Sequence, residues 1–160
     1  MSSPQASPWT SPEWVLRTQV LLDSYARWLG RELIDRSGTP VEQSERLYTA
    51  PFVVVAHGTE ADPILNYANR VALTLWETDL DTLLALPSRK TAEPMHRDER
   101  ARMLQRTREC GYIDDYQGIR ISTTGRRFLI RQAIVWNLVD VAGANAGQAA
   151  TFSEWEFLPE

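Results

Sequence analysis

The sequence contains only one cysteine, Cys110, so it cannot form an intramolecular disulfide or a cysteine-cluster metal site. It has no long apolar run, because the longest, residues 52–56, is far shorter than the roughly 20 residues of a membrane helix. Its first residues lack the basic start and apolar centre of a signal peptide. The net charge of −4 gives no basic excess to attract a phosphate backbone. We therefore expect a cytoplasmic protein without a membrane or nucleic-acid partner.

The N-terminal part of the chain divides into a tail and a helical extension. Residues 1–11 are rich in proline and serine and poor in apolar side chains, so we expect a disordered tail. Beyond them, apolar residues recur near the 3.6-residue period of a helix. These positions are Trp14, Leu21, Tyr25, Trp28, Leu29 and Leu33. We predict a long amphipathic helix over residues 12–36, within an N-terminal helical extension over residues 12–46, ahead of a domain over residues 47–158.

A β-hairpin is the clearest element of that domain. Ile119, Ile121 and Thr123 alternate with polar residues, and Gly125 can supply the positive φ of a tight turn before a second run rich in β-branched residues. Other segments have strand or helix patterns as well. The predicted strands are residues 52–56, 64–68, 113–122, 127–140 and 148–157, and the predicted helices are 41–48, 70–76, 79–86 and 97–110.

This order of elements, with two strands, several short helices and three antiparallel strands, is that of a PAS domain. A narrower resemblance is carried by seven runs of the sequence, residues 51–58, 62–70, 86–89, 118–120, 125–128, 135–137 and 147–150. On these runs, residues 47–157 resemble a PAS-related group, the MEKHLA domain, which occurs in single-domain bacterial proteins and at the C-terminus of plant class III homeodomain leucine-zipper proteins. The hexapeptide that names the family is absent, as are the homeodomain and the zipper, so the DNA-linked role of the plant members does not carry over.

We therefore expect an α+β fold with a PAS-like five-stranded antiparallel sheet, helices on one face, and a long N-terminal helix before it. The resemblance implies a non-catalytic sensory or small-ligand-binding module that regulates a partner through dimerisation. The apolar N-terminal helix would form the homodimer. Two alternatives remain: a small cone-shaped α+β enzyme or ligand carrier, and a pure dimerisation module. The cone-shaped folds place their helices mostly before the sheet, whereas here two strands precede the central helices.

Six residues are candidates for contacting a ligand between the helices and the sheet. Asn69 stands where a helix N-cap belongs, so capping is a sufficient explanation for it. Trp136 and Asn137 must point to opposite faces of their strand, and we expect Trp136 to face the ligand. Because the inward polar groups are neutral, the expected ligand is neutral and largely apolar. The candidates are Tyr67, Asn69, Trp76, Trp136, Asn137 and Gln148.

No cofactor or metal can be named from the residues. Some PAS relatives bind haem through a histidine on the third helix, and His96 is the residue that could correspond, although its position before that helix favours a solvated loop histidine. Photoadduct chemistry in such domains needs a cysteine that residues 86–91 lack. Asp114 and Asp115 could form a carboxylate pair only across a bulge, because strand neighbours face opposite ways. Since no nucleophile or phosphate-binding motif is present, we do not expect an enzyme.

Overall fold

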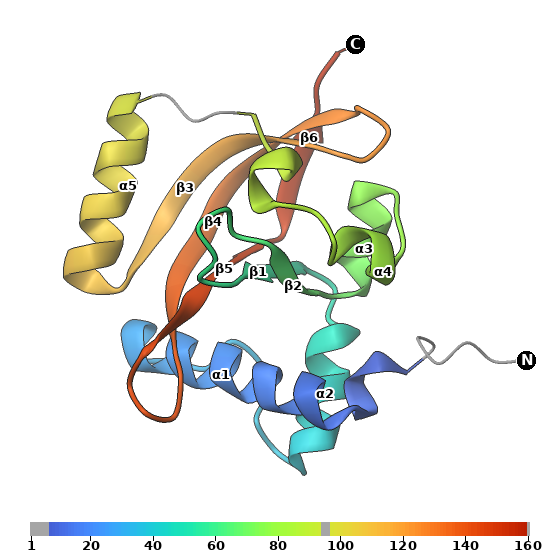
Figure 1. Ribbon diagram of the computed structural model, residues 1–160, viewed down its shortest axis with the longest axis vertical. Helices are drawn as coiled ribbons and strands as arrows, with labels where there is room; N and C mark the ends of the chain where they lie inside the picture. Colours follow the sequence, from blue (N-terminus) through green and yellow to red (C-terminus); the bar gives the residue numbers. More distant parts are fainter. Residues whose placement is uncertain (1–6, 94–96, 160) are drawn as a thin grey trace, which may run out of the picture.

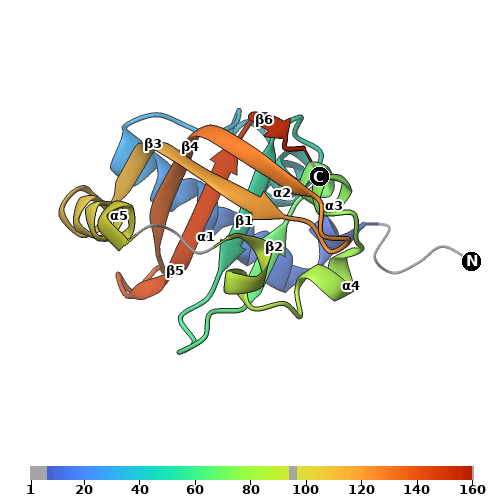
Figure 2. The same ribbon diagram turned by 90° about the horizontal axis from the view of Figure 1, so that it is seen from above.

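The computed structural model describes residues 7–93 and 97–159, and in it an antiparallel sheet lies between helices (Figure 1, Figure 2). The 3₁₀ turns are η2 (Pro8–Thr10) and η3 (Ser88–Thr91). The helices are α1 (Pro12–Leu29), α2 (Pro40–Tyr48), α3 (Arg70–Trp76), α4 (Leu80–Leu83) and α5 (Arg97–Cys110). The strands are β1 (Val53–His57), β2 (Leu65–Ala68), β3 (Tyr112–Ile121), β4 (Arg127–Val139), β5 (Asn145–Phe152) and β6 (Glu154–Phe157).

The main strands lie in the order β2-β1-β5-β4-β3, which confirms the predicted five-stranded sheet. The last predicted strand, residues 148–157, is divided in two. The chain leaves β5 at Ser153, and β6 then pairs with the first half of β4, while β5 pairs with its second half. The long β4 strand therefore carries β3 along one edge and β5 followed by β6 along the other.

Helices cover both faces of the sheet. Trp136 donates its indole N–H to the carbonyl of Leu21 in α1, whereas the neighbouring Asn137 donates its amide to the carbonyl of Thr107 in α5. Successive strand residues point to opposite faces, so α1 and α5 lie on opposite sides of β4. On β5, Phe152 shares a face with Gln148 and packs against Trp76 of α3. The central helices thus occupy one face, as predicted, and α1 covers the other.

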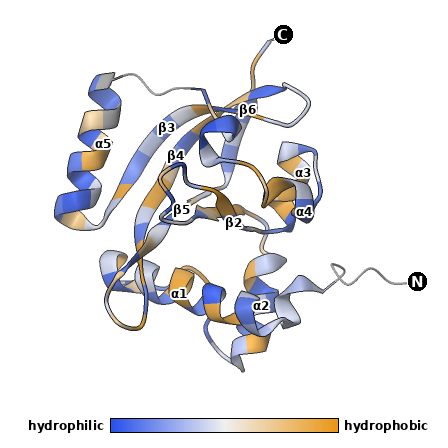
Figure 3. Ribbon diagram, in the orientation of Figure 1, coloured by the Kyte–Doolittle hydropathy of each residue, from blue (hydrophilic) through white to orange (hydrophobic). Residues whose placement is uncertain are grey.

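The N-terminal helix is shorter than the predicted 12–36. It starts after the N-cap Ser11, whose hydroxyl accepts from the N–H of Trp14, and it ends at Leu29 because Gly30 adopts a left-handed conformation at φ 71°. Hydrophobic and hydrophilic residues alternate along this helix (Figure 3). The buried apolar residues of α1 are Trp14, Leu21, Leu22 and Tyr25.

Residues 8–10 were expected in the tail but form η2, and the Trp9 ring lies 5.4 Å from that of Tyr48 in α2. The rest of the expected tail, residues 1–6, lies outside the described residues. The second helix begins with a capping box in which Thr39 and Glu42 bond each other's backbone N–H groups. This box fixes a second helix beside α1, so the extension is a two-helix unit on the sheet.

The central helices agree with prediction in number, although α4 is shorter than the predicted 79–86. Asp79 caps it by accepting from the N–H of Thr82 at 2.8 Å, and η3 follows Pro87. The helix α5 has the predicted bounds and ends at Gly111, which adopts φ 86°. The haem candidate His96 lies outside the described residues.

Candidate functional site

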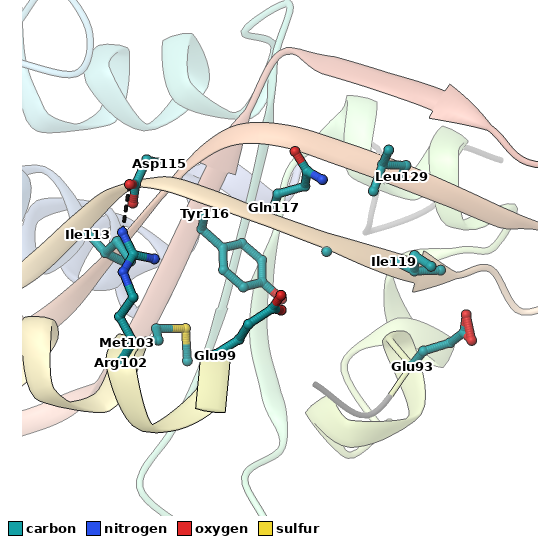
Figure 4. A pocket seen from close by; sticks show the side chains of 11 residues that line it. Glu93, Glu99, Arg102, Met103, Ile113, Asp115, Tyr116, Gln117, Ile119 and Leu129 are labelled. Carbon is teal, nitrogen blue, oxygen red and sulfur yellow. Dashed lines mark hydrogen bonds and ion pairs between the residues drawn. The ribbon is translucent and has the colours of Figure 1, made fainter. Parts of the chain in front are cut away.

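A pocket lies between α5 and β3 (Figure 4). Its volume is about 380 Å³, within the range of small-molecule sites. Met103 on the helix and Ile113 and Tyr116 on the strand give it an apolar and aromatic wall. The full lining is Glu93, Glu99, Arg102, Met103, Ile113, Asp115, Tyr116, Gln117, Gly118, Ile119 and Leu129.

Gly118 shapes this pocket through its missing side chain. A Cβ at this position would lie 2.5 Å from the hydroxyl oxygen of Tyr116, so the Tyr116 ring can lie along the strand only because residue 118 is glycine. The β3–β4 register shifts twice, between Ile113 and Tyr116 and between Tyr116 and Gly118. These irregularities aim the Tyr116 side chain, which is buried, at the space beside α5.

Ion pairs neutralise most charges around the pocket. Arg102 of α5 binds Asp115 of β3 at 2.7 Å, and Arg127 binds Glu93 at 2.5 Å. The backbone N–H of Glu93 also donates to the carbonyl of Ile119, which fixes the segment after η3 to the β3 edge. Arg102 and Asp115 are more than half exposed at the rim, whereas Arg127 and Glu93 are 44% and 32% exposed. Apolar side chains of α5 and β3 form one side of the pocket, which suits a molecule with an apolar part.

Asp115 lines the pocket, and it shares one ion-pair partner with its neighbour Asp114. Arg106 of α5 lies 3.8 Å from a carboxylate oxygen of Asp114 and 3.9 Å from one of Asp115. The register shift after Ile113 supplies the bulge that such a meeting requires. Both carboxylates are exposed and face arginines rather than the pocket's apolar wall, so they hold α5 against β3 and do not form an acid–base pair.

The structure does not bring all six predicted site residues together. Tyr67 and Trp136 lie on the face that α1 covers: the Tyr67 ring is 4.7 Å from that of Trp14, and Trp136 bonds Leu21. Both are fully buried. Burial also raises the pKa of the Tyr67 phenol. The expectation that Trp136 faces the pocket side is therefore wrong, because this large ring fills the interface with α1.

Asn137 and Gln148 are brought together on the α5 side of the sheet. The Gln148 amide donates to the side-chain oxygen of Asn137 at 3.2 Å, and Asn137 donates to the carbonyl of Thr107 at 2.8 Å. Neither residue lines the α5–β3 pocket. Their amides hold the last turn of α5 on the sheet.

The remaining two predicted residues have structural positions. Trp76 is buried and packs edge-on against Phe128 at 5.3 Å. Asn69 caps α3 as predicted, accepting from the N–H of Ala72 at 3.3 Å, and its amide donates to the carbonyl of Phe52 at 2.8 Å. Their contacts explain both residues without a ligand.

The pocket-lining residues are not among the six predicted site residues, although Gly118 and Ile119 lie in the matching run 118–120. The available signal was Gly118 inside a predicted strand, since a strand glycine often marks a bulge or a close approach. Within residues 7–93 and 97–159, no group of three or more His, Cys, Asp or Glu side chains is placed to hold a metal ion. In the same part of the chain, no helix combines the length and apolar character needed to cross a bilayer.

Comparison with known sequences gives matches among plant proteins. Homeobox-leucine zipper protein ATHB-9 of Arabidopsis thaliana is 26% identical over 154 residues, covering 93% of this chain and 18% of that protein. Homeobox-leucine zipper protein HOX29 of Oryza sativa subsp. indica is 26% identical over 160 residues, covering 98% of this chain and 18% of that protein. The chain thus spans less than a fifth of the length of these relatives.

Solved structures agree on the fold. The PAS domain of a protein from Colwellia psychrerythraea superposes with a TM-score of 0.59 at 8% identity, covering 73% of this chain and 94% of that chain. An RNA-binding light-oxygen-voltage receptor gives a TM-score of 0.60 at 17% identity, covering 74% of this chain and 34% of its own. These identities show a shared PAS-like fold and no more. The sequence matches the MEKHLA domain over residues 15–157, a span that begins within α1 and ends with β6, and the chain therefore belongs to the MEKHLA domain family.

Proposed function

We propose that the chain is a sensory module that binds a small molecule without catalysis in the pocket between α5 and β3. The observation that carries the proposal is a pocket of about 380 Å³ in which apolar side chains of α5 and β3 lie beside polar groups and most of the rim charges are paired with each other. Membership of the MEKHLA family and the PAS-like fold support it. The proposal keeps the cytoplasmic setting expected from the single Cys110.

The proposed ligand is uncharged and largely apolar. An ionised group against Met103 and Ile113 would lose hydration without gaining a partner of opposite charge. The Arg102–Asp115 pair closes one side of the rim and would have to open for a charged ligand to bind there. Tyr116 and Gln117 offer neutral hydrogen-bonding groups.

Two neighbouring α5 residues provide a matched test. Met103 lines the pocket and Leu104 is 41% exposed, so Met103→Gln makes the wall polar while Leu104→Gln makes the same chemical change outside. We expect the neutral dye Nile red to bind the unmodified chain and the Leu104→Gln variant, and to bind Met103→Gln at least about tenfold more weakly. Native mass spectrometry of the purified protein should also reveal a small molecule carried from the host cell. Equal dye binding by both variants, or no binding by any of them, would contradict the proposal.

We propose that the chain regulates a partner as a homodimer. A surface between α1 and the β4–β5 loop supports this proposal. Leu16 of α1 is 60% exposed, and Val141 in the β4–β5 loop is 95% exposed. Both line a groove of about 140 Å³ between the helix and the loop. Trp14, Leu21, Leu22 and Tyr25 of α1 are buried within the chain, whereas Leu16 at this groove offers exposed apolar surface for self-association. A dimer in light scattering that becomes a monomer on Leu16→Asp would support it, and a monomeric unmodified chain would contradict it.

A further inference from the structure

The last turn of α5 and the end of α1 meet at one residue of the sheet, Asn137. The side chain of Asn137 donates to the carbonyl of Thr107 in α5 at 2.8 Å, and its backbone N–H donates to the carbonyl of Gly111 at 2.9 Å. On the other side, the carbonyl of Asn137 accepts the indole N–H of Trp28 at 2.9 Å. One residue therefore bonds the pocket helix and the N-terminal helix at the same time.

Direct packing reinforces this connection. A Cβ at Gly111 would lie 2.2 Å from the Trp28 ring, so the indole is in close contact with the backbone at the end of α5. Only glycine allows this approach, and it also supplies the φ of 86° that ends the helix. A shift of the α5 end toward or away from the sheet must move the Trp28 ring or break its hydrogen bond.

The rest of α5 is held much more loosely. Among the α5 side chains that the structure describes, Thr107 is the only buried one, and Met103 and Arg106 are half-buried. The ion pair of Arg102 with Asp115 is more than half exposed, and such pairs add little stability. Figure 1 shows α5 standing at the side of the sheet, joined to β3 by a tight connection at its C-terminal end. The helix can therefore pivot about Thr107–Gly111 while the pocket beside Met103 opens or closes.

We propose that Asn137 and Trp28 form a relay that transmits the position of α5 to α1. Occupation of the pocket would displace the N-terminal part of α5, and the strain at its fixed end would reach α1 through the Asn137 carbonyl and the Trp28 indole. The signalling role rests on the proposed ligand-binding function, whereas the coupling between the two helices is a property of the ligand-free chain. The helix α1 is then the surface through which the module acts on a partner.

Hydrogen exchange in the ligand-free full chain tests the coupling. Trp28→Phe removes the indole N–H and keeps an aromatic ring against Gly111, so its effect on α5 reports transmission through the relay. We expect amides 104–111 to exchange about fivefold faster in this variant, the factor for losing one buried hydrogen bond. Asn137→Ala removes the bond to Thr107 and should conversely accelerate exchange in residues 22–30. Unchanged exchange across the relay in both variants would overturn the proposal.

A control separates coupling from a general loss of stability. Phe128→Leu alters the opposite end of β4, where Phe128 packs on Trp76, and should lower global stability without touching the relay. The comparison is made between variants of equal unfolding midpoint. If Phe128→Leu accelerates hydrogen exchange in residues 22–30 and 104–111 as strongly as the relay variants do, the effect is a global loss of stability and the relay is rejected.

Nile red tests whether a molecule bound in the pocket affects α1 through the relay. We expect the dye to change exchange in residues 22–30 of the unmodified chain and to leave them unchanged in Trp28→Phe, although it binds both. A change of equal size in both would overturn the relay. Failure of the dye to bind at all would overturn the ligand-binding proposal, while the exchange rates of the ligand-free variants would still decide the coupling.

Discussion

The indole N–H of Trp136 donates to the main-chain carbonyl of Leu21 across 3.2 Å, joining the centre of β4 to the middle of α1. The Tyr25 ring packs edge-on against the same indole at 5.1 Å. These contacts bury Trp136 completely. The N-terminal helix is thus part of the folded core and does not need a second molecule to cover its apolar side.

Truncating Trp136 tests this packing. Trp136→Ala should lower the free energy of unfolding by about 3–5 kcal/mol, because it leaves a cavity between sheet and helix. Trp136→Phe keeps most of the ring volume and should lower it by roughly 1–2 kcal/mol, including the lost hydrogen bond. Urea unfolding measures both. Leu16→Ala, at a position 60% exposed, should stay within about 0.5 kcal/mol of the unmodified chain. An equally stable Trp136→Ala variant would contradict the α1 packing.

Replacing Asn69 should be more damaging than replacing an ordinary helix cap. Its oxygen accepts from the N–H groups of Val54 and Ala72, and its amide donates to the carbonyls of Leu47 and Phe52. Asn69→Ala leaves several of these buried groups unpaired, at about 1–3 kcal/mol for each, so we expect a loss of more than about 2 kcal/mol in urea unfolding.

The exposed cap of α4 provides the comparison. Asp79→Ala removes one hydrogen bond to Thr82 at the surface and should lower the free energy of unfolding by about 1 kcal/mol. Equal losses for Asn69→Ala and Asp79→Ala would mean that Asn69 acts only as a cap.

Local signals accounted for much of the fold. The N-cap at Asn69, the bounds of α3 and α5, and the end of α5 at Gly111 follow from side-chain chemistry within a few residues. The matched motifs supplied the PAS-like five-stranded sheet. The predicted end of α1 at residue 36 is wrong because Gly30 already adopts a left-handed conformation and caps the helix after Leu29. The division between β5 and β6 depends on how far β4 extends, which no local signal encodes.

The site was harder to predict because it depends on which face each helix covers. Alternation correctly separated Trp136 from Asn137, but a large aromatic ring suits an interface with α1 as well as a pocket wall. The alternation of side chains between the two faces of the sheet also shifts along β4 where Gln132 adopts φ 51°. This is a left-handed conformation that a glutamine in the sequence does not predict. Tyr116 takes its place in the pocket through register shifts in β3 and the absent side chain of Gly118.

Two glycines of the β4–β5 region should respond differently to alanine. Both have positive φ, 84° at Gly143 and 120° at Gly147. A Cβ at Gly143 meets nothing within 4 Å, so Gly143→Ala adds only backbone strain of about 1–2 kcal/mol. A Cβ at Gly147 would lie 2.0 Å from the carbonyl oxygen of His57, and that backbone cannot rotate away.

Gly147→Ala should therefore separate β5 from the end of β1 and destabilise the chain well beyond Gly143→Ala. Thermal unfolding of the two variants measures the difference. A shift in the unfolding midpoint that is the same for both would mean that strain alone matters and that β1 and β5 do not approach closely at His57.

Two exposed carboxylates at helix N-termini make the free energy of unfolding depend on pH. Bonding to the backbone N–H of Thr39 lowers the pKa of Glu42 from its usual 4.5, and bonding to that of Thr82 lowers the pKa of Asp79 from its usual 3.8. A carboxylate with a lower pKa in the folded state stabilises the fold above its unfolded pKa, and this stabilisation is lost as the pH falls through the folded value. The free energy of unfolding should therefore drop between about pH 5 and pH 3. The double variant Glu42→Gln and Asp79→Asn keeps both caps as neutral isosteres, so its urea midpoint should fall less over that window. Parallel pH profiles for the two proteins would show that these carboxylates titrate alike in the folded and unfolded chains.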